Sequence, residues 1–269
     1  MLVLVACHAQ AHRRRFKIEM LQSNQIYLGD CLSVMQEIDD KSVNLILCDL
    51  PYGTTACKWD VIIPFDKLWM QYNRIIKENG CIALFGSEPF SSLLRTSNLK
   101  IFKYDWCWEK SNPANIASAN TRPLKYHEII SIFYKNQPIY NKQMIPRSEL
   151  GTLRLKNKNN PIRFSGTDIQ NNAGVKKDYD INRYDENLKN PSDIIYFKVN
   201  RGKLHPTQKP VELCEYIIKT YTNEGDLVLD NCFGSGSTLV AARNLNRQFI
   251  GIEKEEKYFN IAKERLNLC

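Results

Sequence analysis

The feature that most constrains the fold is an alternation of short, continuously apolar segments with longer amphipathic ones. Five apolar segments have the length of strands and are rich in β-branched residues: Gln25–Leu28, Val43–Cys48, Cys81–Phe85, Leu227–Leu229 and Gln248–Ile252. Continuous apolar runs are typical of strands buried on both faces, as in a parallel sheet covered by helices. We therefore expect parallel strands at the centre of the fold.

Amphipathic segments lie between these predicted strands. Apolar residues recur at helical spacing in five of them: Asp30–Ile38, Phe65–Ile76, Pro210–Tyr221, Ser237–Leu245 and Lys257–Leu266. Strand and helix patterns that alternate in this way are typical of βαβ units. The sequence predicts an α/β fold with a doubly wound, mostly parallel sheet of the Rossmann-like kind.

A polar segment interrupts this alternation from residue 134 to residue 200. Asn141–Lys203 contains 13 Lys and Arg but 7 Asp and Glu, in a chain whose formal net charge is +8. Most of the excess positive charge therefore lies in one stretch, which is a hint of a polyanionic partner. A flexible surface insertion and an inserted recognition segment both fit this composition.

These boundaries divide the chain into four parts. We expect residues 1–20 to be a tail or an extension, because Met1–Cys7 is apolar but precedes its arginines, the reverse of the order in a signal peptide. Residues 21–133 and 201–269 are the two halves of one α/β domain, separated by the polar segment. No apolar run approaches the ~20 residues needed to cross a bilayer, and the spacing of the cysteines fits neither a zinc site nor a disulfide framework.

Near the C-terminus, a glycine turn connects a predicted strand to the predicted helix that follows it. The strand Leu227–Leu229 runs into Asp230-Asn-Cys-Phe-Gly-Ser-Gly-Ser-Thr, and the next strand is followed by Glu253. Glycines allow a ligand to approach the backbone closely, and an acid at the end of the second strand accepts hydrogen bonds from ribose hydroxyls. This order favours a site for an adenosine-containing cofactor; a structural turn beside a solvated Glu253 is the alternative.

A second candidate site follows the strand Val43–Cys48. There the chain reads Asp49-Leu50-Pro51-Tyr52, which places a carboxylate, a rigid backbone and an aromatic ring at the end of a strand. A capped turn, in which Asp49 bonds its own backbone and Tyr52 packs, explains the same residues.

These motifs together resemble those of the amino-methylating DNA methyltransferases, whose hallmark is Asp/Asn/Ser-Pro-Pro-Tyr. The resemblance covers residues 27–266 and includes Asp49–Tyr52, the glycine turn, Gly29-Asp30 and the segment His205-Pro-Thr-Gln-Lys-Pro210. Asp49–Tyr52 precedes the polar segment and the glycine turn follows it, which is the permuted order of the β class.

The chain departs from the family's pattern in both motifs. Leu50 stands where the family usually has its first proline, so the backbone carbonyl that the resemblance assigns to this position is kept while rigidity is lost. In the cofactor motif, Asn231 and Cys232 replace the commoner Pro and Phe, and Phe233 is expected to supply the aromatic contact.

The resemblance implies an enzyme that transfers a methyl group from S-adenosylmethionine to an exocyclic amino group of a base flipped out of double-stranded DNA. The Asp49 carboxylate and the Leu50 carbonyl would accept the amino hydrogens, Tyr52 would stack on the base, and Pro51 completes the catalytic motif. The implied cofactor-binding residues are Asp30, Lys209, Asp230, Phe233, Gly234, Gly236, Ser237 and Glu253.

Adenine N6 is the favoured target, because Ser is commoner at position 49 in the cytosine group. Cytosine N4, an RNA amino group and a catalytically silent DNA-binding protein are the alternatives. We predict that segment 134–200 reads the target sequence, and that Lys110 and Asn112 border the target-base pocket. Relatives of this class often dimerise, so the resemblance implies a homodimer as one expected assembly. It also implies a separately encoded restriction endonuclease as a partner if the protein belongs to a restriction-modification system. We expect a cytoplasmic protein without a metal or a membrane partner.

Overall fold

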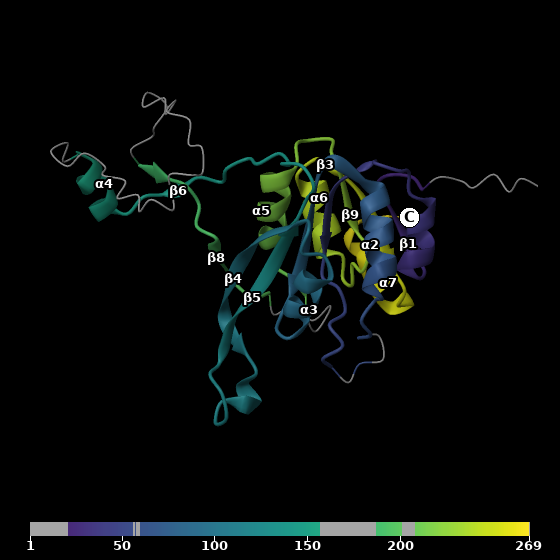
Figure 1. Ribbon diagram of the computed structural model, residues 1–269, viewed down its shortest axis with the longest axis horizontal. Coiled ribbons are helices and arrows are strands. Elements are labelled where there is room, and N and C mark those ends of the chain that lie inside the picture. The colour runs from purple at the N-terminus through teal and green to yellow at the C-terminus, as the bar shows by residue number, and fades with distance from the viewer. Residues whose placement is uncertain (1–20, 56, 58–59, 157–186, 201–207, 269) are drawn as a thin grey trace, which may run out of the picture.

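The computed structural model describes residues 21–55, 57, 60–156, 187–200 and 208–268. In this part of the chain, eight strands form one sheet in the order β1-β10-β9-β2-β3-β5-β4-β8 (Figure 1). The strands are β1 (Gln25–Leu28), β2 (Val43–Cys48), β3 (Ile76–Gly86), β4 (Phe102–Ala114), β5 (Lys125–Phe133), β8 (Ile194–Phe197), β9 (Leu227–Asp230) and β10 (Gln248–Glu253). The expected α/β fold with a mostly parallel sheet is confirmed.

On the two sides of the β9–β2 pair, the chain connects successive strands in opposite directions across the sheet. Strands β1, β10, β9, β2 and β3 are parallel, whereas β5 runs antiparallel between β3 and β4. The chain leaves β9 towards β10 on one side, and it leaves β2 towards β3 on the other side. In open α/β sheets such a switch point opens a crevice at the carboxyl ends of the strands, where ligands bind.

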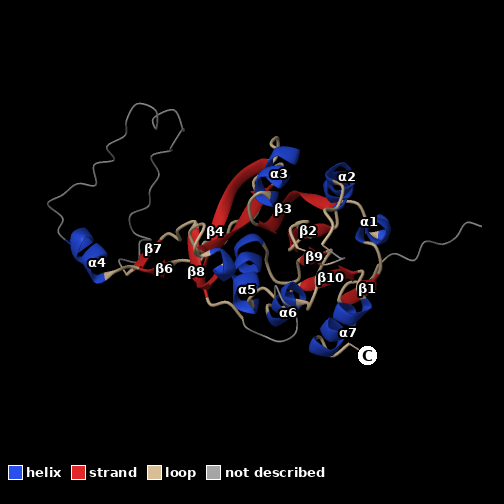
Figure 2. Ribbon diagram, turned by 90° about the horizontal axis from the view of Figure 1, so that it is seen from below, coloured by secondary structure: helices blue, strands red, loops and turns tan. Residues whose placement is uncertain are grey.

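Helices cover both faces of the sheet because the central strands are apolar on both faces. In β2, Leu45 and Leu47 face one core, whereas Ile46 and Cys48 face the other. The first core is closed by α5 (Val211–Tyr221), α6 (Ser237–Asn244) and α7 (Glu256–Arg265). The second is closed by α1 (Cys31–Val34), α2 (Phe65–Ile75) and α3 (Phe90–Ser97), on the opposite side of the sheet (Figure 2).

Some elements differ from the sequence-based expectation. The helix expected over Asp30–Ile38 is the short α1 followed by a 3₁₀ helix, Met35–Glu37. Strands β4 and β5 form a long hairpin with a second 3₁₀ helix, Ile116–Ser118, near its end (Figure 1). Strand β4 lacks a continuous apolar run, because buried and partly exposed residues alternate along it.

The polar segment 134–200 makes its only sheet contact with the main body, among its described residues, through β8. Strand β8 pairs in parallel with β4 at the outer edge of the sheet. Strands β6 (Ile145–Pro146) and β7 (Leu188–Lys189) form a separate ladder next to α4 (Glu149–Lys156), away from the main sheet (Figure 1). The tail predicted at residues 1–20 lies outside the described residues. No helix in the described part of the chain is long and apolar enough to cross a membrane.

The central position of β9 gives a stability prediction. Leu229 is fully buried in β9, which is flanked by β10 and β2. Leu229→Ala is expected to lower the free energy of unfolding by about 2–5 kcal/mol, because the surrounding strands cannot close the cavity. Leu93 on α3 is 51% exposed, so Leu93→Ala is the matched control and is expected to change stability by less than about 0.5 kcal/mol. Urea denaturation measures both, and equal losses would contradict the burial argument.

Candidate active site

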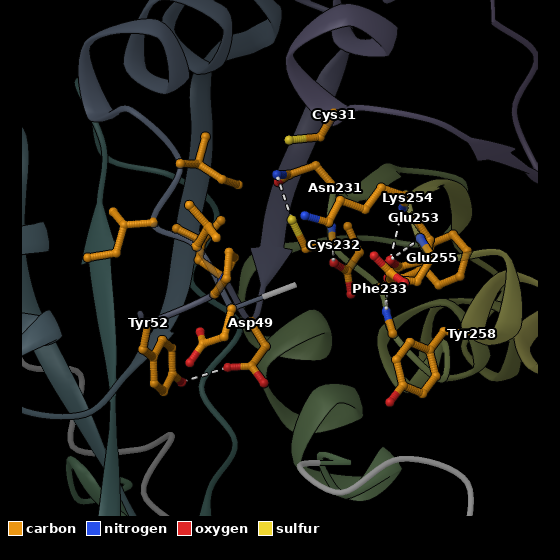
Figure 3. Close-up of a pocket in the computed structure, with 18 of the residues that line it drawn as sticks. Cys31, Asp49, Tyr52, Asn231, Cys232, Phe233, Glu253, Lys254, Glu255 and Tyr258 are labelled. Carbon is orange, nitrogen blue, oxygen red and sulfur yellow. Dashed lines mark hydrogen bonds between the residues drawn. The ribbon is translucent and has the colours of Figure 1, made fainter. Parts of the chain in front are cut away.

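The ends of four neighbouring strands meet at one edge of the sheet. Asp49 follows β2, Asp230 ends β9, Glu253 ends β10 and Asp30 lies just beyond β1. All four residues border one cavity of about 320 Å³. The loop after β2 and the glycine turn, which are far apart in the sequence, thus face the same space (Figure 3).

Asp49 and Tyr52 lie together on one side of this cavity (Figure 3). The Tyr52 hydroxyl donates a hydrogen bond of 2.6 Å to Asp49 Oδ1, and the Tyr52 ring stacks on Phe90 at 4.8 Å. Burial, and next the negative charge of Asp49, raise the pKa of Tyr52 well above its usual value. Tyr52 therefore stays a hydrogen-bond donor that orients the carboxylate.

Leu50 contributes both to the core and to the cavity wall, which the sequence motif does not reveal. Its side chain is buried in the core on the α1–α2–α3 face, while the residue also borders the cavity, as does Pro51. A leucine at the usual proline position therefore fills the core next to the loop. This packing offers a source of rigidity in place of the missing ring.

The glycine turn contains two left-handed residues with different surroundings. Gly234 has a φ of +53° and borders the cavity, and its N–H donates a hydrogen bond of 2.8 Å to the Glu253 carboxylate. Gly236 has a φ of +78° and does not border the cavity; a Cβ there would lie 2.9 Å from Ala262 Cβ on α7. Gly236 is thus required by the turn and by packing against α7.

The acids on the glycine side are both buried. Glu253 accepts hydrogen bonds from the backbone N–H groups of Gly234, Lys254 and Glu255. Burial raises the pKa of Glu253, and these donors oppose that shift. Burial also raises the pKa of Asp230 to about 7, against the hydrogen bond from the Thr238 hydroxyl.

Asp30 has a local structural role in addition to its place at the cavity. It is the N-cap of α1, and its Oδ1 accepts hydrogen bonds from the backbone N–H and the hydroxyl of Ser33, at 3.0 and 3.2 Å. This cap explains why an acid begins the helix. It also fixes the Asp30 carboxylate at the cavity wall.

Two buried polar atoms at the cavity indicate a polar ligand. Gln208 Oε1 and Ser237 Oγ belong to residues that line the cavity, and neither atom has a hydrogen-bond partner among the described residues. Buried polar groups without partners are costly, so they usually mark the position of a ligand or an ordered water. The donor and acceptor set here fits an adenosine-type molecule that carries an amino acid group.

Asp60 holds the loop beside the cavity and was missed by the sequence analysis. Its carboxylate accepts hydrogen bonds from the backbone N–H groups of Gly53, Thr54 and Thr55, at 2.7 to 2.9 Å. Burial opposes ionisation of Asp60, but a hydrogen bond with the Thr55 side chain and these backbone donors outweigh it and lower the pKa of the carboxyl group. An acid several residues beyond the motif has no recognisable spacing, so only the fold identifies it.

Glu128, Gln208 and Tyr258 are further cavity residues that the sequence analysis did not select. Lys110 and Asn112, which it placed at the target-base pocket, are not among the residues that border the cavity. Lys110 instead donates a hydrogen bond of 2.9 Å to Glu128. Glu128 sits within a strand pattern and has no motif around it, so its location was not predictable from sequence alone.

The match to a family of known proteins extends over most of the fold. Residues 43–264 match the N6/N4 family described as DNA methylase. The chain belongs to this DNA methylase family. The family model thus includes both the Asp49–Tyr52 loop and the glycine turn.

Curated relatives of this DNA methylase include two type II methyltransferases from Moraxella bovis. M2.MboI is 27% identical over 89% of this chain and 86% of its own length. M1.MboII is 28% identical over 92% of this chain and 98% of its own length.

Solved structures show the same fold. The M1.HpyAVI–SAM complex is 28% identical and has a TM-score of 0.62, covering 91% of this DNA methylase and 99% of that chain. The cytosine-N4-specific PvuII DNA methyltransferase is 15% identical with a TM-score of 0.57, covering 92% of this chain and 94% of the other. At that identity the second likeness supports the fold alone.

The raised pKa of Asp230 gives a prediction about stability and pH. Because burial raises this pKa to about 7 in the folded protein, the folded state holds a proton that the unfolded chain releases at lower pH. The free energy of unfolding should therefore fall as the pH rises from about 4, the usual pKa of the carboxyl group, to about 7. Asp230→Asn, which imitates the protonated form, should show a shallower fall. Urea denaturation without cofactor measures both, and equal slopes would contradict the assignment.

Proposed function

We propose that this DNA methylase transfers a methyl group from S-adenosylmethionine to the N6 amino group of adenine in double-stranded DNA. The observation that carries the proposal is the shared cavity: the Asp49 carboxylate and the Gly234 turn border the same space. A base and a cofactor bound there would place an amino group next to a methyl donor. Methylation of cytosine N4 is the alternative, and the Asp at position 49 favours adenine.

The cofactor proposal is supported by the chemistry of the cavity wall. Glu253 and Asp230 offer carboxylates, and Ser237 and Gln208 offer buried oxygens that have no hydrogen-bond partner in the part of the chain that the structure describes. M1.HpyAVI was solved as a complex with SAM. When bound, the cofactor supplies a methyl group that is already activated by the sulfonium sulfur.

In the proposed mechanism, the chain's own residues orient and activate the base. The lone pair of an exocyclic amine is delocalised into the ring, so the nitrogen is a poor nucleophile. Acceptance of the amino hydrogens by the Asp49 carboxylate and the Leu50 carbonyl favours a tetrahedral nitrogen. The Asp49 charge also stabilises the positive charge that develops on nitrogen during transfer. Tyr52 is proposed to stack on the extruded base, which has to leave the duplex to reach the cavity.

The central test is the substitution of Asp49. Asp49→Ala is expected to bind S-adenosylmethionine as the wild type does, but to lose methyl transfer by at least about 100-fold, because the acceptor of the amino hydrogen is gone. Calorimetry measures cofactor binding, and transfer of a labelled methyl group to DNA measures activity. An Asp49→Ala variant with undiminished transfer would contradict the role of the carboxylate.

The product identifies the base. Mass spectrometry of nucleosides from DNA methylated by the wild type is expected to show N6-methyladenine. N4-methylcytosine in its place would establish the alternative. Methylation of neither base, together with tight cofactor binding, would overturn the proposed substrate.

We also propose that segment 134–200 reads the target sequence. Its described part joins the main sheet through β8 at the outer edge, and positive charge is concentrated in the overlapping stretch Asn141–Lys203. Lysine and arginine side chains there can hold phosphates, while arginine and asparagine can read base edges. The names of the type II relatives support a restriction endonuclease as a separately encoded partner.

Exchange of this segment gives a specificity prediction. Grafting residues 134–200 from a family member that methylates a different sequence should transfer that member's specificity, since the cavity-lining residues are left in place. Methylated sites mapped by sequencing DNA from expressing cells provide the measurement. A graft that is active but keeps the original recognition sequence would refute the assignment.

A further inference from the structure

Four charged side chains of alternating sign form a row that begins at the Asp49 carboxylate. The Lys209 ammonium contacts Asp49 Oδ2 and lies 3.4 Å from Glu128 Oε2. Lys110 Nζ then donates a hydrogen bond of 2.9 Å to Glu128 Oε1. We call Asp49, Lys209, Glu128 and Lys110 the charge row. Its members come from four separate segments, so only the fold brings them together.

The charge row is too deeply buried to be an ordinary surface network. The exposed side-chain fractions are 8% for Lys209, 7% for Lys110, 19% for Glu128 and 25% for Asp49. Isolated charges at such depth are strongly disfavoured, and each needs a partner of opposite sign. Removal of one member therefore leaves a neighbour without compensation.

Glu128 lies where it can influence the ion pair between Lys209 and Asp49. Its Oε2 is buried and receives no hydrogen bond within the described residues, so its interaction with Lys209 there is an ion pair. With Asp49 as its only anionic partner, the buried Lys209 ammonium would be compensated from one side alone, and its position beside Asp49 would be less well defined. With Glu128 present, the positive charge is divided between two carboxylates.

We propose that Glu128 is a positioning residue for methyl transfer: it holds the Lys209 ammonium between two carboxylates, and Lys110 fixes Glu128 in place. Lys209 then anchors one oxygen of Asp49, while the Tyr52 hydroxyl holds the other. This inference rests on the proposed role of Asp49 as the acceptor. It assigns a function to a residue outside both sequence motifs.

The electrostatics of the site agree with this arrangement. Burial lowers the pKa of Lys209, but the charges of Asp49 and then Glu128 outweigh burial and raise it. Burial likewise opposes ionisation of Glu128, yet Lys209 and Lys110 lower its pKa. Lys125 also faces Glu128 through a weaker electrostatic interaction. The Phe85 ring, 5.1 Å from Lys209 Nζ, contributes no charge of its own.

The first test does not need enzyme activity. NMR titration of the Lys209 Nζ nitrogen, in the whole protein, measures its pKa in the wild type and in Glu128→Gln, a nearly isosteric change. We expect a lower Lys209 pKa in Glu128→Gln, because one of the two stabilising charges is lost. Glu109→Gln is the matched control: Glu109 is exposed on β4, next to Lys110 in sequence, and this variant should leave the Lys209 pKa unchanged. An unchanged pKa in Glu128→Gln would overturn the proposal.

The second test separates positioning from a general structural role. Glu128→Gln is expected to keep its affinity for S-adenosylmethionine and to lose kcat by roughly tenfold to a hundredfold. Its rate should also decline at a lower alkaline pH than the rate of the wild type does, because Lys209 loses its proton earlier. Glu128→Asp, which keeps the charge, should restore the alkaline rate. A loss that is uniform from neutral to alkaline pH and is not restored by Glu128→Asp would overturn the proposal.

The two tests distinguish this inference from the proposed function. If the wild type methylates cytosine N4 in place of adenine N6, both expectations for Glu128 still apply, because either base offers an amino group to Asp49. If Asp49→Ala keeps full activity, the acceptor role fails, and a normal alkaline rate in Glu128→Gln then overturns the positioning role as well. If Asp49→Ala is inactive while Glu128→Gln resembles the wild type, the positioning role fails alone.

Discussion

The pairing of β9 with β2 determines where the two sequence motifs meet in the fold. It joins the early and late halves of the chain through the partners Leu45–Val228 and Ile46–Leu229. The Asn44 side chain strengthens the junction, since it donates to Asp226 and accepts from the Leu227 N–H. Because parallel strands end at the same edge, this pairing places the loop after β2 next to the glycine turn after β9.

Contacts across the same junction determine how the cavity is built. The Tyr72 hydroxyl on α2 donates a hydrogen bond of 2.5 Å to Asn231 in the glycine turn, although the two residues lie far apart in the sequence. The Lys209 ammonium, from the segment before α5, reaches the Asp49 carboxylate at the end of β2. The cavity is thus a joint product of two chain segments, and neither half contains a complete site by itself.

The sequence predicted those strands whose side chains are apolar on both faces of the sheet. Strands such as β2 and β10 are buried on both faces, so their continuous apolar runs predicted them directly. The hairpin of β4 and β5 was not predicted in the same way. Buried and partly exposed residues alternate along β4, and the buried end of β5 is interrupted by the polar Ser131. Glu128 was not predictable, since its partners are set by tertiary contacts and a single acid in a strand has no local signature.

The attachment of the polar segment at β8 has a consequence for how such a protein diversifies. Strand β8 adds to the sheet beyond β4, with β5 and β3 between it and the strands that end at the cavity. An insertion that joins the sheet at an outer strand, and that also contacts the surface end of α5 through Asn141, can vary in length and composition while the packing of the central strands stays intact. Selection can therefore remodel the periphery of this fold independently of its chemical centre.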